Sequence, residues 1–268
     1  MENEVVIRIQ DLKFKFSEES NYVLNGINLE IFPGQVIGYI GPNGAGKTTT
    51  IKLLLNLLSG YEGKIEIFGK DIRLDKVNYK FKIGYVPENG ELYENLTGAE
   101  LLEFFGKIYK VEPKELPQKI NKLASLLEIS DSINERISSY SKGMKQKLLI
   151  ISALLHNPEI IFLDEPLNGL DANSVQIFKE MLALLAKEGK TIFYSSHLMD
   201  VVEKISDRII LLNKGKIIAD GTFEEIKKKS KSGSLEDAFS QLTGFNESNK
   251  VAEDFVNSLT SSPKDKSE

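Results

Sequence analysis

The sequence Gly41-Pro42-Asn43-Gly44-Ala45-Gly46-Lys47-Thr48 carries the strongest structural signal in the chain. Its spacing, G-x-x-x-x-G-K-[ST], is that of a glycine-rich loop whose backbone N–H groups surround a phosphate. The apolar run Val36–Ile40 precedes it and is typical of a buried strand. Helical sequence follows from Lys47 to Ser59, with Gly60 as the stop. Because strand, loop and helix come in the order that the motif requires, we predict a phosphate-binding loop rather than a chance glycine-rich turn.

The residues of such a loop differ in what they bind. The glycines let the backbone curl around an anion, and the positive end of the following helix adds to the attraction. Lys47 is expected to reach the β- and γ-phosphates of a nucleotide, and the Thr48 hydroxyl to bind Mg²⁺. The predicted nucleotide contacts in this segment are Gly41, Pro42, Asn43, Gly44, Ala45, Gly46, Lys47, Thr48 and Thr49.

A second segment, Ile160–Glu165, is an apolar strand that ends in two carboxylates. Alone, this pattern also fits a strand that enters a solvated turn. With the glycine loop present, we expect Asp164 to hold Mg²⁺, directly or through water. Glu165 is then placed beside the γ-phosphate, where it polarises the attacking water.

Strands and helices alternate on both sides of a helical block that spans about residues 96–156. Thr97 and Glu100 form a predicted capping box at the start of this block. Alternation of strands with helices predicts a mainly parallel sheet covered by helices. Strands are expected at Val5–Ile9, Lys64–Phe68, Ile160–Leu163, Thr191–Ser195 and Arg208–Leu212, and helices at Leu101–Tyr109, Lys119–Ile129, Ser141–His156, Asn173–Lys187, Leu198–Ile205 and Leu235–Leu242.

Composition excludes several other classes of protein. The 268 residues carry 34 basic and 39 acidic side chains, a net charge of −5, which disfavours a polyanion partner. Absence of cysteine excludes disulfides and thiolate chemistry, and two histidines are too few for a histidine-rich metal centre. No apolar run approaches the ~20 residues of a membrane span, and no secretory signal is evident.

The segment Tyr140–Gln146, Tyr-Ser-Lys-Gly-Met-Lys-Gln, resembles the signature motif of the ATP-binding subunits of ABC transporters, usually Leu-Ser-Gly-Gly-Gln. Tyr140, Lys142 and Met144 depart from that pattern. Ser141 and Gly143 are retained, and the resemblance implies that both touch nucleotide. Ser141 also fits the N-cap of a helix whose positive end suits a γ-phosphate.

Further matches follow in family order. Leu167–Asp171 resembles the D-loop, which in the family crosses a dimer interface, and His197 resembles the switch histidine that contacts the γ-phosphate. Phe16 resembles the aromatic residue that stacks on adenine, with a core strand aromatic as the alternative and Tyr22 as a weaker candidate. His156 is assigned a structural role.

One position departs in chemical type. Glu88 stands where the family usually has a glutamine that helps to hold Mg²⁺. A carboxylate can still bind the ion, although it adds negative charge near the phosphates. The Pro87-Glu88 pair, the downstream Leu92-Tyr93 and the segment Ser234–Gly244 resemble exporter-type members of the family.

The resemblance covers about residues 3–245 and implies an α/β fold: a P-loop NTPase core with a mainly parallel sheet, an N-terminal antiparallel β-subdomain and an inserted α-helical subdomain. The expected divisions are a nucleotide-binding domain over 1–222 with its helical subdomain at about 89–157, a short helical extension over 223–245 and a mobile tail over 246–268. The basic run Lys227–Lys231 is interpreted as a solvated helix face or linker.

The implied function is that of an ATP-hydrolysing subunit with ATP and Mg²⁺ as ligands and Glu165, His197 and Lys47 as catalytic residues. Its partners would be a separate membrane-spanning permease and a second ATP-binding subunit, either an identical copy or a paralogue, without nucleic acid. It would sit in the cytoplasm against the inner face of the membrane and drive an exporter. The alternatives are an ABC-type ATPase that acts on ribosomes or DNA, and a nucleotide-binding regulator without turnover.

Overall fold

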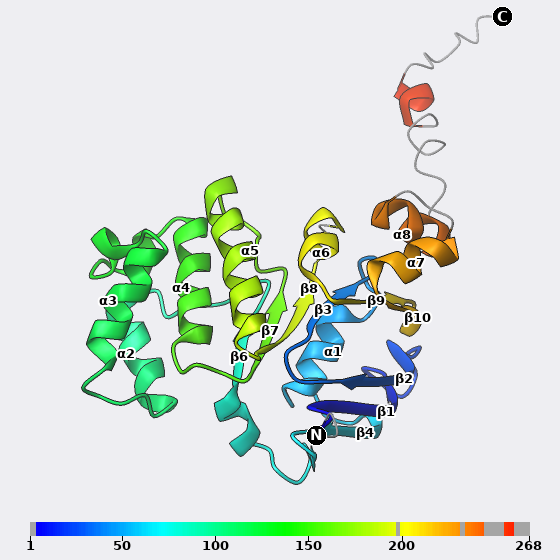
Figure 1. Ribbon diagram of the computed structural model, residues 1–268, viewed down its shortest axis with the longest axis horizontal. Helices are drawn as coiled ribbons and strands as arrows, with labels where there is room; N and C mark the ends of the chain where they lie inside the picture. Colours follow the sequence, from blue (N-terminus) through cyan, green and yellow to red (C-terminus); the bar gives the residue numbers. More distant parts are fainter. Residues whose placement is uncertain (1–3, 197–198, 231–233, 244–254, 260–268) are drawn as a thin grey trace, which may run out of the picture.

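The computed structural model describes residues 4–196, 199–230, 234–243 and 255–259. A six-stranded sheet at its centre has the order β10-β9-β3-β8-β7-β6 (Figure 1). The pairs from β9 to β6 are parallel and only the edge strand β10 runs antiparallel, so the predicted mainly parallel sheet is confirmed. Its strands are β3 (Val36–Ile40), β6 (Ile83–Val86), β7 (Ile160–Asp164), β8 (Thr191–Ser195), β9 (Arg208–Asn213) and β10 (Lys216–Gly221).

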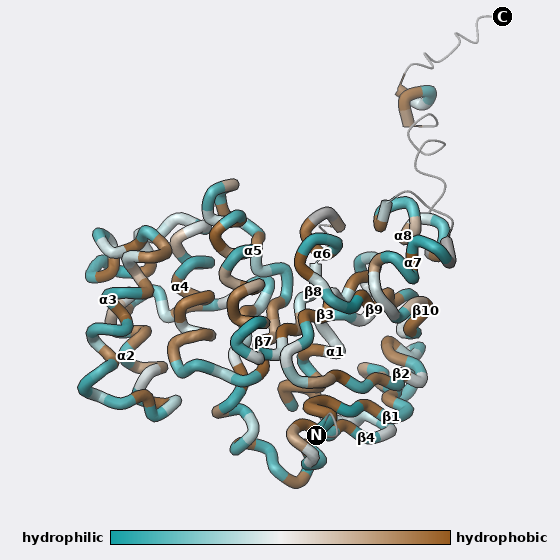
Figure 2. Tube along the Cα trace, viewed as in Figure 1, coloured by the Kyte–Doolittle hydropathy of each residue, from teal (hydrophilic) through white to brown (hydrophobic). Residues whose placement is uncertain are grey.

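The central strands β3, β7 and β8 are buried along their whole length because both faces of the sheet are covered. On β7, Ile160 and Phe162 join one core, and Ile161 and Leu163 join the core on the opposite face. This alternation follows from the period of two in a strand. Figure 2 shows apolar residues along the central strands.

A smaller antiparallel sheet and helix α1 pack against the face of the large sheet that carries Ile160 and Phe162 (Figure 1). Its order is β2-β1-β4-β5, as the N-terminal β-subdomain requires. The strands are β1 (Ile7–Phe14), β2 (Leu24–Ile31), β4 (Glu62–Ile67) and β5 (Lys70–Asp71), and a 3₁₀ helix η1 (Asn78–Lys82) leads from them to β6.

Helix α1 (Lys47–Leu54) is shorter than the expected Lys47–Ser59. Asn56 adopts a left-handed conformation with φ 50°, and the Leu57 N–H donates to the carbonyl of Lys52. This arrangement satisfies the last carbonyls and ends the helix before Gly60 is reached. An asparagine tolerates this conformation better than most residues, so the chain stops its helix at Asn56.

Helices α2 (Gly98–Ile108), α3 (Leu116–Leu126) and α4 (Lys142–Leu154) form the inserted helical lobe, with the 3₁₀ helices η2 (Ser130–Ser132) and η3 (Ile137–Ser139). The lobe has an apolar core of its own, including Leu101, Leu102 and Ile120. The predicted capping box is confirmed: the Glu100 N–H donates to Thr97 Oγ1, and the Thr97 N–H donates to Glu100 Oε2.

The second face of the large sheet is covered by α4, α5 (Ala172–Lys187), α6 (Met199–Ile205), α7 (Phe223–Ser230) and α8 (Leu235–Thr243). Ile226 on α7 and Leu235 and Ala238 on α8 are buried in this core, so the C-terminal helices pack on the domain that precedes them. Within the described residues, no helix is long and apolar enough to cross a membrane. The expected tail over 246–268 lies outside the described residues except for 255–259, which are helical.

Candidate active site

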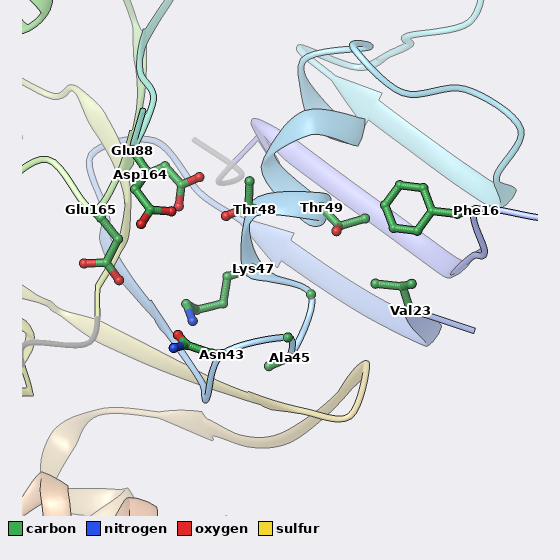
Figure 3. A pocket seen from close by; sticks show the side chains of 12 residues that line it. Phe16, Val23, Asn43, Ala45, Lys47, Thr48, Thr49, Glu88, Asp164 and Glu165 are labelled. Carbon is green, nitrogen blue, oxygen red and sulfur yellow. The ribbon is translucent and has the colours of Figure 1, made fainter. Parts of the chain in front are cut away.

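A cavity of about 630 Å³ opens at the carboxyl ends of the parallel strands, around the glycine-rich loop. Open α/β sheets place ligands at this edge. Figure 3 shows Glu88, Asp164 and Glu165 gathered beyond Lys47 at one end and Phe16 beside Val23 at the other. The lining residues are Phe16, Val23, Asn43, Gly44, Ala45, Gly46, Lys47, Thr48, Thr49, Glu88, Asp164 and Glu165.

The loop needs its glycines for two different reasons. Gly46, at the N-cap of α1, has φ 109°, a conformation that side chains rarely adopt. At Gly41 the restriction is space, because a Cβ would lie 2.3 Å from the carbonyl oxygen of Leu212. Both glycines therefore let the loop backbone pack closely on its neighbours, Leu212 beside Gly41 and Leu24 beside Gly46.

Lys47 extends along the loop from the first turn of α1 and is buried. Its ammonium group donates to the carbonyl oxygens of Gly41 at 2.8 Å and Pro42 at 3.3 Å. Burial lowers the pKa of Lys47, whereas the nearby carboxylates, led by Glu165, act in the opposite direction. The lysine thus places a desolvated cation at the carboxylate end of the cavity.

Asp164 ends strand β7 and is 1% exposed. Neither of its carboxylate oxygens has a hydrogen-bond partner in the described part of the chain. Burial raises the pKa of Asp164, while the hydroxyls of Thr48 and Ser195 act to lower it. Unpartnered carboxylate oxygens beside a threonine hydroxyl form an oxygen donor set that fits Mg²⁺.

Glu165 is buried and has a left-handed backbone with φ 48°. Its N–H donates to the carbonyl of Ser195 at 3.0 Å, and the Ser196 hydroxyl donates to its Oε2 at 3.3 Å. Strained backbone of this kind costs about 1–3 kcal/mol and is concentrated at functional sites. The carboxylate is therefore aimed from a fixed backbone into the cavity.

Glu88 and Phe16 mark the two ends of the cavity from loops. Glu88 follows β6 and is exposed, and it faces the other two carboxylates across the cavity end (Figure 3). Phe16 follows β1, is 67% exposed and meets Phe14 edge-on, with ring centroids 5.0 Å apart. Because most of the ring is open to solvent, the alternative of a core strand aromatic does not fit Phe16.

Ser141 and Gly143 do not line this cavity. Ser141 is the N-cap of α4, where its hydroxyl accepts from the Met144 N–H at 3.2 Å. A Cβ at Gly143 would lie 2.9 Å from the carbonyl oxygen of Gly169, so this helix start packs directly on the loop after Glu165. The chain brings the loop and carboxylates together but leaves the two signature residues outside.

His197 lies outside the described residues. His156 is structural in its contacts: its Nε2 lies 3.0 Å from the Ile83 carbonyl, and its ring stacks on Tyr109 at 3.8 Å. Burial lowers the pKa of His156.

Sequence reasoning missed Val23, Ser195, Ser196 and Gln146. Val23 lines the cavity beside Phe16, and Ser195 and Ser196 surround the two carboxylates. The register of β7 with β8, which pairs Asp164 with Ser195, is the signal that connects them, and it is visible only after folding. Gln146 is buried on α4 and donates to the Pro166 carbonyl, a contact that no local sequence pattern predicts.

The sequence model of the ABC transporter family, described as "ABC transporter", matches residues 24–168. The chain belongs to this family, and within it to the subunits that bind and hydrolyse ATP. It is 36% identical over 234 residues to the ABC transporter ATP-binding protein NatA of Bacillus subtilis, a match that covers 86% of this chain and 95% of that protein.

Solved structures agree on the fold. A structure of an ATP-binding subunit of an ABC transporter superposes with a TM-score of 0.83 at 29% identity, over 89% of this chain and 99% of that one. The ATP-binding cassette MJ0796, a dimer in a post-hydrolysis state with ADP and Pi, superposes with a TM-score of 0.72 at 26% identity, over 81% and 98% of the two chains. The predicted α/β architecture with its antiparallel subdomain is confirmed.

Proposed function

We propose that this chain powers an exporter by closing on ATP together with a second ATP-binding subunit and driving a separate membrane-spanning permease. The observation that carries the proposal is the division of the site. Lys47, Asp164 and Glu165 share one cavity, whereas Ser141 and Gly143 lie outside it on the start of α4. A nucleotide that needs both sets requires a second subunit, which makes ATP the link between them.

Each cavity residue has a role in this proposal. The loop N–H groups and Lys47 bind the phosphates, and the exposed ring of Phe16 stacks on adenine. Asp164 and Thr48 hold Mg²⁺, with Glu88 close enough to contribute. The bound ion neutralises charge on the phosphates. Among the described residues no group of three or more His, Cys, Asp or Glu side chains could hold a metal, so oxygen atoms of the nucleotide and of water would have to supply the other ligands of the ion.

Glu165 acts as the general base that takes a proton from the attacking water. Its buried position and fixed backbone hold the carboxylate at the phosphate end of the cavity. His197, on the segment after β8, is assigned to the γ-phosphate by resemblance. Loss of the γ-phosphate contacts after hydrolysis releases the second subunit, and the permease follows this opening and closing.

The subunit is placed at the cytoplasmic face of the membrane through its permease. Export as the direction rests on the resemblance of Pro87-Glu88, Leu92-Tyr93 and Ser234–Gly244 to exporter-type members. Two identical subunits suffice, since one chain supplies both halves of a composite site, and a paralogue would serve in the same way.

Two substitutions test the enzyme. Lys47→Ala is expected to abolish ATP binding, because it removes the cation of the phosphate end. Glu165→Gln is expected to keep ATP binding while stalling turnover, which traps an ATP-bound dimer measurable by light scattering. Wild-type hydrolysis by Glu165→Gln would show that another group acts as base.

The transport assignment has its own test. The tagged protein is purified from detergent-solubilised membranes of its host, and co-purifying proteins are identified by mass spectrometry. A multi-span membrane protein in near-equal amount is the expected result. Recovery with ribosomes or DNA, or without any membrane protein, would overturn the transport assignment and leave the ATPase assignment standing.

A further inference from the structure

Gln146 is a buried polar side chain that the site described above does not use. It lies on α4, one and a half turns after the N-cap Ser141, and is 5% exposed. Its amide Nε2 donates to the carbonyl oxygen of Pro166 at 2.9 Å. Gln146 does not line the cavity, so it has no direct contact with a nucleotide bound there.

The carbonyl that Gln146 holds belongs to Pro166, the residue that directly follows Glu165. Glu165 has φ 48°, which an L-residue rarely adopts. A residue before proline is restricted further, because the proline ring crowds its backbone. This conformation persists only where the surrounding structure enforces it.

Two elements enforce it from opposite sides. From β8, the carbonyl of Ser195 accepts from the Glu165 N–H at 3.0 Å. From α4, Gln146 binds the carbonyl on the far side of Pro166. The same helix contacts the next part of the loop, where Gly169 faces both Gly143 and the aliphatic stem of Lys142. The Glu165-Pro166 segment is thus held at its N–H end by β8 and at its carbonyl end by α4, the helix that starts with the signature residues.

We infer that Gln146 is a positioning residue that fixes the Glu165 carboxylate for attack of water on ATP, an assignment that rests on the proposed role of Glu165. Without the amide donor, the Glu165-Pro166 backbone relaxes toward ordinary angles and carries the carboxylate away from the γ-phosphate. Because α4 begins at Ser141, the clamp also joins the segment that faces one nucleotide to the base that acts on the other.

The first test is Gln146→Met, which keeps the length of the side chain and removes the donor. We expect kcat to fall by roughly 10- to 100-fold, since misplacement by about 1 Å costs this much, while KM for ATP stays unchanged. The matched control is Gln176→Met, which removes an exposed glutamine on α5 that donates to Glu180 at 2.8 Å. This control is expected to keep the wild-type kcat.

The second test is a double-mutant cycle with Glu165→Gln, read by single-turnover hydrolysis. If Gln146 acts through Glu165, the double variant keeps the residual rate of Glu165→Gln alone. A further drop that multiplies the two single effects would overturn the assignment. Thermal melting of each variant establishes that it is folded, and Gln146→Glu, whose ionised carboxylate offers no donor, replaces the methionine variant if that fails to fold.

A failure of the positioning role of Gln146 can be distinguished from a failure of Glu165 as the proposed base. A wild-type rate in folded Gln146→Met, with Glu165→Gln still stalled, overturns the positioning role alone. Normal turnover by Glu165→Gln overturns the proposed base itself. If neither Gln146 variant folds, Gln146 is structural and the positioning assignment is withdrawn.

Discussion

At the scale of single residues, the cavity has an excess of negative charge before any nucleotide arrives. Among the described residues that line it, Lys47 is the only cationic side chain, and Glu88, Asp164 and Glu165 are carboxylic acids. An ATP molecule without a metal would bring further negative charge to the same end. Binding should therefore depend on Mg²⁺ more strongly here than in a site with a neutral residue at position 88.

Glu88→Gln is the substitution that tests this charge argument. We expect it to tighten binding of metal-free ATP about 2- to 5-fold, a modest factor because Glu88 is exposed and screened. In this variant, the difference between the ATP affinity measured by calorimetry with Mg²⁺ and that measured with EDTA should become smaller. Glu91→Gln, at an exposed position that does not line the cavity, is the control and should leave both affinities unchanged. Equal narrowing in both variants would assign the effect to net charge.

Phe16 allows a second test at this scale. Stacking on a base contributes about 1–3 kcal/mol, so Phe16→Ala should weaken binding of MgATP by roughly 5- to 100-fold. Phe16→Tyr keeps the ring and should keep the affinity. Phe104→Ala removes an exposed aromatic from α2, away from the cavity, and serves as the control. An unchanged affinity in Phe16→Ala would remove Phe16 from the site.

At the scale of elements, the helical lobe meets the core through the end of α2 and the residues after α4. Tyr109, the C-cap of α2, stacks on His156 with an interplanar angle of 12°. Burial is the largest cause of the lowered pKa of His156. The charges of Lys119 on α3 and Lys190 before β8 add to it, and the Ile83 carbonyl opposes it. The folded protein therefore prefers the neutral imidazole at this contact.

The consequence is a pH dependence of stability. The unfolded chain takes up a proton at His156 near the ordinary pKa of about 6.5, and the folded chain does so only at lower pH. Between these two values the unfolded state binds more protons, so the free energy of unfolding falls as the pH decreases below about 6.5. The melting temperature should fall less steeply over pH 6.5 to 5 in His156→Gln. His197→Gln, which changes the only other histidine, should keep the wild-type slope.

Elements differ in how well the sequence predicts their bounds and contacts. The capping box of α2 was predictable because both partners lie within four residues. The end of α1 was misplaced because Gly60 is the stronger stop signal, whereas Asn56 ends the helix through bonds that form only in the folded turn. The phosphate loop and the two carboxylates were predictable from contiguous motifs. The clamp from Gln146 to Pro166 joins positions 20 apart, and nothing in either segment predicts the other.

At the scale of the whole molecule, we propose that one chain holds two halves of different sites. Ser141 does not line the cavity of its own chain, so a head-to-tail pair would complete each site with the signature residues of its neighbour. The order of the motifs along the chain could not indicate that Ser141 lies apart from the cavity, since all the motifs follow one another on one chain as they do in the family. The distances between them are set by the helical lobe, which carries α4 to one side of the sheet (Figure 1).

Mixing two inactive variants tests the shared site. Lys47→Ala removes the phosphate cation, and Ser141→Asp keeps an N-cap residue while placing negative charge where a phosphate is expected. Each alone should be inactive. Random pairing makes about half of the dimers mixed, and each mixed dimer has one intact composite site out of two. About a quarter of all composite sites are then intact, so the mixture should regain up to roughly one quarter of wild-type ATPase activity. The double variant mixed with itself is the control, and no recovery in the mixture would contradict the shared site.

The resting position of Lys47 gives the loop a way to discriminate among ligands. Its ammonium group already rests on the carbonyls of Gly41 and Pro42, so an arriving phosphate chain enters by exchange. Such an exchange is favourable only if the newcomer is a better acceptor than two neutral carbonyls, as an anionic oxygen is. A ligand whose phosphates stop short of the lysine gains nothing from it. We therefore expect Lys47 to favour ligands whose phosphate chain is long enough to reach its ammonium group.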